Sequence, residues 1–297
     1  MLNNFMEIQE KEVKLYKKEG KDLRCLACAH KCLISEGKTG ICGVRQNIKN
    51  KLYLLVYGRI AARHIDPIEK KPLHHFLQNT STFSIGTVGC NFKCNFCQNH
   101  DISQFQEFYG DKILGERLSP SQIVRQAVRS SCKSISYTYN EPTILIEFVK
   151  DTSRLARRKK LKNIMVTNGY LSLESFNFIK NYIDAMNIDL KSFTEEFYRE
   201  RCKASLKPVL ETIKRVYKKG IHLEITTLII PGENDGIEEL KNIAKFIASI
   251  DKNIPWHISR FFPHHKLMYR PMTSINILQK TQEIGKKYLN NVYIGNI

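Results

Sequence analysis

Short apolar runs rich in β-branched residues alternate with longer amphipathic stretches from residue 82 to the end of the chain. Apolar runs of about four to eight residues are typical of strands buried in a sheet. The stretches between them have helical spacing, and Ser119-Pro120, Ser172 and Asp235 are placed to cap helices. We therefore predict strands over residues 82–89, 134–139, 163–167, 185–190, 222–230, 256–261 and 292–295.

This repeated order of strand, helix and strand predicts an α/β fold with a parallel sheet. The six or seven units are fewer than the eight of a closed barrel. An incomplete (β/α)6-type TIM barrel fits the pattern best, and a doubly wound open sheet is the alternative.

The first part of the chain does not follow this rhythm. A charged segment that suggests a helix is followed by a cysteine-rich loop and by strand-like runs over residues 52–57 and 59–65. We predict two domains: a small N-terminal Cys-rich module over residues 1–81 and a partial-barrel core over residues 82–297.

Three cysteines directly follow the first strand of the core: Cys90, Cys94 and Cys97, in a C-x3-C-x2-C spacing. A closed [4Fe–4S] cluster or a structural zinc site takes four protein ligands, so three thiolates leave one metal position free for a molecule that is not protein. A zinc site completed by His100 is the alternative.

A second set of cysteines has four members, Cys25, Cys28, Cys32 and Cys42, with His30 nearby. Four thiols can close a metal site by themselves, and structural zinc is the first choice. The C-x2-C-x3-C-x9-C spacing differs from the ferredoxin pattern, but an auxiliary iron–sulfur cluster and unligated thiols stay open. Cys132 and Cys202 stand alone and are expected to be packed thiols.

Polar residues gather where the predicted strands end. In parallel α/β barrels the loops at the carboxyl ends of strands share one mouth, so these residues are expected to line a common cavity. The segments are residues 137–143, 166–170, 187–191, 230–235 and 255–263.

Charge and hydropathy bound the possible partners. The formal charge of +18 permits nucleic-acid binding, although a solvated lysine-rich surface is the favoured interpretation. No apolar stretch reaches the roughly 18 residues of a membrane span, and the first residues lack the apolar core of a secretory signal. We expect a cytoplasmic protein that does not bind membranes.

The triplet, with Phe96 before its last cysteine, resembles the cluster motif of the radical S-adenosylmethionine (SAM) superfamily. The chain is similar to pyruvate formate-lyase activating enzymes and most similar to the AmmeMemoRadiSam system radical SAM enzymes. The resemblance covers nearly the whole chain, through residues 25–32, 40–45, 66–76, 86–100, 137–143, 189–191 and 255–263.

The resemblance assigns roles to individual residues. It implies that Cys90, Cys94 and Cys97 hold a [4Fe–4S] cluster whose unique iron binds SAM through its amino and carboxylate groups. Phe96 would lie against the adenine, Glu141 near the methionyl ammonium, Asp189 at the ribose diol and Lys191 at the methionyl carboxylate. Weaker expectations, for which a merely structural role is an equal alternative, fall on Thr167, Asn168 and His257.

The implied reaction is reductive cleavage of SAM to a 5′-deoxyadenosyl radical, which abstracts hydrogen from a protein or peptide substrate. An alternative is activation of a glycyl-radical enzyme, and a distant one is a basic metal-stabilised RNA-binding module without catalysis. The resemblance also implies a reductant such as ferredoxin or flavodoxin, and Memo-like and AMMECR-like partner proteins.

Overall fold

The largest sheet has eight strands in the order β16-β15-β14-β13-β12-β11-β9-β8 in the computed structural model, which describes residues 11–297. Seven strands run parallel to their neighbours, and β8 pairs with β9 in antiparallel fashion. Their bounds are β8 (Ala62–Pro67), β9 (Ser81–Gly86), β11 (Ser134–Tyr137), β12 (Lys162–Thr167), β13 (Ala185–Asp189), β14 (His222–Ile229), β15 (Trp256–Arg260) and β16 (Val292–Gly295).

The spatial order of these strands is the order of the chain. A doubly wound sheet reverses its order at a switch point, so that alternative does not describe this molecule. Because parallel crossovers are right-handed, an unreversed order puts all connecting helices on one side of the sheet. The α/β class with a large, mostly parallel sheet is thus confirmed. The crossover helices are α3 (Pro120–Arg129), α4 (Ile146–Arg158), α5 (Leu173–Ile179), α7 (Lys207–Lys218), α8 (Ile237–Ile250) and α9 (Ile275–Lys286).

Helix starts follow the capping residues at two of the three predicted positions. Ser119 forms a capping box with Gln122, and the Ser172 hydroxyl accepts from the Ser175 N–H at 2.9 Å. The predicted cap at Asp235 is wrong, because its carboxylate accepts from Gly232 in the preceding turn and α8 begins after Gly236.

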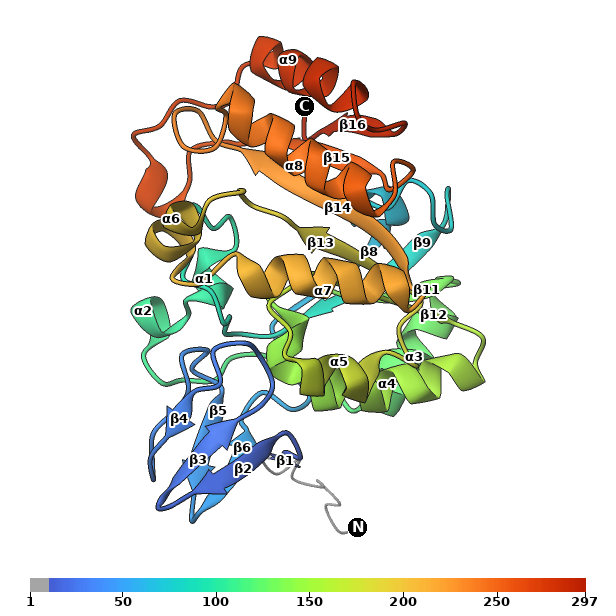
Figure 1. Cartoon of the computed structure of the whole chain (residues 1–297). Coiled ribbons are helices and arrows are strands. Elements are labelled where there is room, and N and C mark those ends of the chain that lie inside the picture. Colours follow the sequence, from blue (N-terminus) through green and yellow to red (C-terminus); the bar gives the residue numbers. More distant parts are fainter. Residues whose placement is uncertain (1–10) are drawn as a thin grey trace.

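The N-terminal part forms two small antiparallel sheets, β1-β6-β5 and β2-β3-β4. Residues 11–19 hold β1 and β2 rather than the suggested charged helix, and residues 1–10 lie outside the described part. Figure 1 shows these strands at the opposite end of the molecule from α8 and α9. The strands of these sheets are β1 (Lys11–Glu12), β2 (Tyr16–Glu19), β3 (Asp22–Cys25), β4 (Leu33–Ile34), β5 (Arg45–Ile48) and β6 (Lys51–Leu54), and β7 (Arg59–Ile60) follows outside both sheets.

Short elements complete the description, and β10 pairs with β7. Among residues 11–297, no helix combines the length and apolar character needed to cross a membrane. The short elements are η1 (Ile68–Lys70), α1 (His100–Ser103), α2 (Gln106–Tyr109), β10 (Glu116–Arg117), η2 (Pro142–Leu145), α6 (Glu195–Phe197), the π-helical turn η3 (Tyr198–Cys202) and η4 (His265–Leu267).

The segment between β8 and β9 packs against the large sheet. Ile68 and Leu73 form a small buried cluster with Ile164 of β12 and Ala185 of β13. Ala185 opens its strand and Ile164 lies near the start of β12, so this segment covers the amino-terminal side of the sheet. The carboxyl ends of the strands lie at the other side, where the predicted cavity is expected.

Candidate active site

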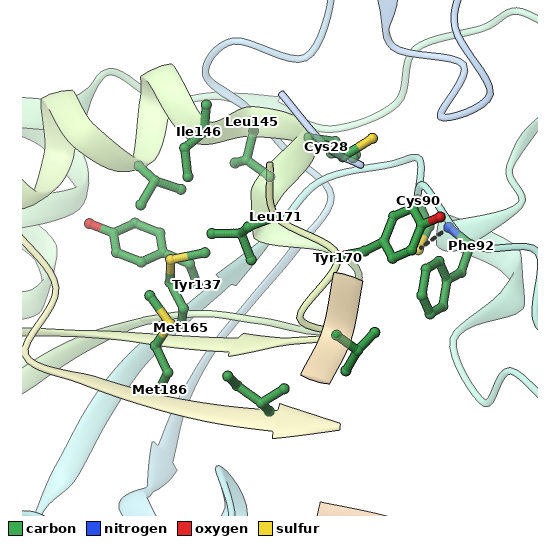
Figure 2. Close-up of a cluster of buried hydrophobic side chains, with 14 of the residues drawn as sticks. Cys28, Cys90, Phe92, Tyr137, Leu145, Ile146, Met165, Tyr170, Leu171 and Met186 are labelled. Atoms are coloured by element: carbon green, nitrogen blue, oxygen red, sulfur yellow. Dashed lines mark hydrogen bonds between the residues drawn. The ribbon is translucent and has the colours of Figure 1, made fainter. Parts of the chain in front are cut away.

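The three cysteines of the triplet line one cavity of about 350 Å³ at the carboxyl ends of the parallel strands. Cys90 and Cys94 are buried, and Cys97 is partly exposed. The Phe92 N–H points to the Cys90 sulfur at 3.4 Å, as Figure 2 shows, and Gln104 Nε2 donates to the Cys94 carbonyl at 2.9 Å. The loop that carries the thiols is therefore ordered by its own hydrogen bonds.

Gly89 allows this loop to approach the N-terminal segment. Its φ is +93°, and a Cβ there would lie 2.6 Å from the Cys42 carbonyl oxygen. Asn140, which follows β11, donates to the Gly89 carbonyl at 2.8 Å and to Thr87 Oγ1 at 3.1 Å. Glycine is required at position 89 because both the backbone conformation and the close approach exclude a side chain.

All three thiols are protonated at neutral pH in the free protein. Burial, followed by the charge of Glu141, raises the pKa of Cys90 well above its usual range, and burial raises the pKa of Cys97 to about 11. For Cys94 a hydrogen bond with Cys202 is the largest cause of a raised pKa. Metal binding therefore has to displace protons from these thiols.

Three further predicted residues line the same cavity: Phe96, Asp189 and Lys191. Lys191 Nζ donates to Asp189 Oδ2 at 2.8 Å and lies 5.9 Å from the centre of the Phe96 ring. Burial alone would lower the pKa of Lys191, but the negative charge of Asp189, which also accepts its hydrogen bond, raises it well above its usual range. The cavity therefore holds a fixed cation beside an anion and an aromatic face.

Glu141, Thr167 and Asn168 also line the cavity, and they are bonded to one another. One Glu141 oxygen accepts from Thr167 Oγ1 at 2.7 Å and from Thr143 N at 2.9 Å, and the other accepts from Asn168 N at 2.8 Å. Burial nevertheless raises the pKa of Glu141. The buried carboxylate thus ties the end of β11 to the end of β12.

Asn168 extends this network to the triplet. Its Nδ2 donates to Asn91 Oδ1 at 2.7 Å, next to Cys90 in the chain. The ends of β9, β11 and β12 are therefore connected by side-chain hydrogen bonds within one cavity wall.

His257 does not line this cavity. Ser259, two residues further along the same strand, lines it instead. Residues two apart on a strand share a face, so His257 lies one layer deeper than Ser259. Its Nε2 is 2.6 Å from Glu224 Oε2. Sequence spacing identified the strand but not the depth of each side chain along it.

Glu224 points into the interior and is fully buried. Its partners are the rings of His222 and His257 and the backbone N–H groups of His74 and His75. Burial alone would raise its pKa, but these four hydrogen bonds hold it well below its usual range. Glu224 thereby fastens the segment before β9 to β14.

Sequence reasoning missed Lys71, which is 4% exposed and lines the cavity. Lys71 Nζ donates to Asp66 Oδ2 at 2.7 Å, and the Tyr139 hydroxyl donates to the same oxygen at 2.8 Å. The dense polar run over residues 66–71 was the available signal, but Tyr139, which donates to Asp66 of this run, lies 73 positions further along the chain.

The donor set fits an iron–sulfur cluster that carries SAM. Three soft thiols face the same cavity as a carboxylate, an ammonium group and an aromatic ring. Asn91 Nδ2 and Asn95 Oδ1 of the triplet loop are buried without a hydrogen-bond partner among the described residues. Within residues 11–297, no three His, Cys, Asp or Glu side chains have converged as around a single ion.

The profile of the Radical SAM superfamily matches residues 84–247, more than half of the chain. The chain belongs to the radical SAM superfamily. This family implies a [4Fe–4S] cluster and SAM as cofactors, and it makes the protein an enzyme. The distant alternative of an RNA-binding module without catalysis is therefore wrong.

Two relatives show how widely the resemblance extends. An uncharacterized protein of Methanocaldococcus jannaschii is 43% identical over 290 residues, which cover 97% of this chain and 85% of that protein. The pyruvate formate-lyase 1-activating enzyme of Escherichia coli is 22% identical over 177 residues, covering 57% of this chain and 71% of that enzyme. The expected relation to activating enzymes is confirmed.

A solved structure supports the fold. SuiB of Streptococcus suis bound to S-adenosylmethionine aligns with a TM-score of 0.55 at 15% identity, covering 73% of this chain and 52% of that one. At this identity the comparison shows a shared fold, which agrees with the sequential parallel sheet.

Proposed function

We propose that Cys90, Cys94 and Cys97 hold the [4Fe–4S] cluster of this enzyme and that SAM binds across the cavity beside them. The observation that carries this proposal is the placement of the three thiols, Phe96 and the Asp189–Lys191 pair around one cavity. When bound and reduced, the cluster supplies the electron that cleaves SAM to methionine and a 5′-deoxyadenosyl radical, which abstracts hydrogen from the substrate.

Lys191 and Asp189 orient opposite ends of SAM in this proposal. Lys191 stays protonated because nearby negative charges raise its pKa, so it can pair with the methionyl carboxylate. Asp189, 34% exposed at its side chain, is free to accept from a ribose hydroxyl. Phe96 offers its ring to the adenine and is supported by Phe197, whose ring centre is 5.7 Å away.

Glu141 has a double role. A carboxylate offers about four acceptor positions, and three are taken by Thr143, Thr167 and Asn168. The remaining position can accept from the SAM ammonium group. Thr167 and Asn168 act as positioning residues that hold this carboxylate in the wall.

Electron paramagnetic resonance tests the assignment of the cluster ligands. We expect the reconstituted, reduced wild-type protein to show a [4Fe–4S] signal that changes when SAM is added. Cys94→Ala should lose the signal, and Cys132→Ala, a buried cysteine outside both sets, should keep it. A SAM-responsive cluster that survives in Cys94→Ala would contradict the proposal.

The substrate is proposed to be a protein or peptide. This rests on the activating-enzyme relative, which acts on another enzyme by its name. Deuterated candidate proteins provide the test, because hydrogen abstraction transfers deuterium to 5′-deoxyadenosine. Deuterium found only with a metabolite would overturn the substrate class.

A glycyl-radical enzyme as substrate is the second candidate, favoured by the same relative. It predicts a stable glycyl-radical signal on the partner protein after turnover. A modified partner without such a signal would favour the AmmeMemoRadiSam assignment, in which Memo-like and AMMECR-like proteins take part. We further propose that the sequential sheet is the incomplete (β/α)6-type barrel of such enzymes.

A further inference from the structure

Four cysteines far from the triplet in the chain surround a second cavity. Cys25, Cys28, Cys32 and Cys42 all contribute to its wall, although 17 positions separate the first from the last. Three of them are buried, the fourth is partly exposed, and none forms a disulfide. The fold therefore gathers four reduced thiols around one small space, from the end of β3, from the β3–β4 connection and from the β4–β5 connection.

His30 lies in the same wall but is already engaged. Its Nε2 is 2.8 Å from the Asn91 carbonyl oxygen, and its ring packs 4.8 Å from the ring of Tyr170. Arg45, also in the wall, is bonded to both oxygens of Glu147. The donors that remain around the cavity are the four sulfur atoms, which are ligands for a thiophilic metal.

The size of the cavity favours a single ion over a cluster. Its volume is about 10 Å³, close to the space of one water molecule, whereas the triplet cavity measured in the same way has about 350 Å³. A four-iron cube needs several times the smaller volume, whereas one ion does not. We propose that Cys25, Cys28, Cys32 and Cys42 bind one Zn²⁺ as a closed structural site.

The sulfur atoms line the cavity without having converged on a common centre. Zinc binding requires them to close to roughly 2.3 Å from the ion. Cys25 is the last residue of β3, and the other three cysteines lie in the connections between strands. Because none of the four is in the middle of a strand, this closure needs only local movement. With four thiolates bound, no position is left for a substrate, which is the mark of a structural site.

The site would join the N-terminal segment to the walls of the active site. Asn91, beside Cys90, and Ile144, just after Glu141, complete the cavity wall. The backbone of Cys28 forms an isolated antiparallel β-bridge with Leu171, which follows β12. Figure 2 shows Cys28 above Tyr170 and Cys90. The zinc site therefore supports the triplet loop from outside, which goes beyond the proposed function and does not depend on it.

Metal analysis of variants isolated without added metal tests the proposal. Wild type should contain about one zinc per chain, besides about four irons from the triplet cluster. The variant in which Cys90, Cys94 and Cys97 are all alanine should lose the iron and keep the zinc. This variant leaves the four-cysteine site intact, so its result does not depend on whether changes at that site disturb folding.

A matched pair of variants locates the ion. Cys25→Ser with Cys28→Ser should lose the zinc, and Cys132→Ser should keep it together with the iron. His30→Gln should also keep the zinc if the ligands are sulfur alone. Cobalt(II) bound to the triple-alanine variant should show the absorption of a tetrahedral all-thiolate site.

Each contrary outcome overturns the proposal. About four irons remaining in the triple-alanine variant would make the site an auxiliary cluster, and no metal in wild type would make the cysteines unligated thiols. Zinc lost by the triple-alanine variant but kept after the double serine change would place the ion at the triplet. Failure of SAM cleavage in a zinc-bearing wild type would instead refute the proposed function alone.

Discussion

At the scale of single residues, the cavity wall is built from charges that hold one another in place. Asp189 and Lys191 are paired at 2.8 Å, and Glu141 is held by three donors. Such preorganisation lowers the cost of orienting a charged ligand, because the wall does not have to be rebuilt when the ligand binds.

Lys191→Gln should weaken SAM binding. Removing a charge-assisted hydrogen bond costs about 1.5–3 kcal/mol, so we expect the KM for SAM to rise about 10- to 100-fold while kcat changes less. Initial rates of 5′-deoxyadenosine formation at varied SAM concentration measure this. The exposed Lys159→Gln is the control, and equal effects of both variants would show that Lys191 does not contact SAM.

The ionisation of Asp66 should make the stability of the fold depend on pH in the acidic range. Although burial alone would raise it, hydrogen bonds from Lys71 and Tyr139 lower the pKa of Asp66 from 3.8 to about 2. A depressed carboxyl pKa stabilises the fold above the unfolded value, and this contribution is lost as the pH falls from about 4 to about 2. The free energies of unfolding in urea of wild type and Asp66→Asn should differ by up to roughly 2 kcal/mol at pH 5. The two values should converge at pH 2.

At the scale of elements, all seven parallel strands were predicted, and their starts agree within one residue. Buried apolar runs made them visible. Their ends were overestimated at five of the seven, by as many as three residues at β9, because the apolar pattern continues into the loops that form the cavity wall. The site loops were identified because polar residues recur in phase with the strands.

What the sequence did not predict depends on contacts between distant segments. The backbone of residues 74–75 reaches Glu224 about 150 positions away, and Lys71 reaches the cavity only because β8 and β9 form a hairpin. No local periodicity encodes such pairings. The depth of His257 was missed for a related reason, since alternation gives the face of a strand residue but not its layer.

Gly89→Ala should disturb the triplet loop. The new Cβ would meet the Cys42 carbonyl at 2.6 Å in addition to the strain of a positive φ, so we expect a loss of at least about 1–3 kcal/mol and a lower iron content. Gly220→Ala has a similar φ of +74° with open space around it, so it reports the strain alone. Equal melting temperatures for both variants would show that the contact with Cys42 is unimportant.

At the scale of the whole molecule, a groove of about 910 Å³ beside the N-terminal sheets carries an excess of basic side chains. Lys38, Lys49, Arg59 and Arg117 line it together with one acid, Asp111. A groove with this balance suits an acidic electron-donor protein, because opposite charges accelerate association.

Reduction by such a donor should be sensitive to salt. With an acidic flavodoxin or ferredoxin as reductant, we expect the rate of SAM cleavage to fall several-fold between 50 and 300 mM salt, since screening weakens steering. Dithionite, a small reductant, serves as the control and should show little change. Lys49→Glu with Arg59→Glu should remove most of the salt dependence, and an unchanged dependence would place the donor elsewhere.

The most direct test of the account is 5′-deoxyadenosine formation by the anaerobically reconstituted protein with SAM and a reductant. We predict the nucleoside from wild type and Cys132→Ala and none from Cys94→Ala. Nucleoside formed equally by Cys94→Ala would contradict the assignment of the triplet as the cluster site, and none from a wild type that holds its full iron would contradict the proposed chemistry.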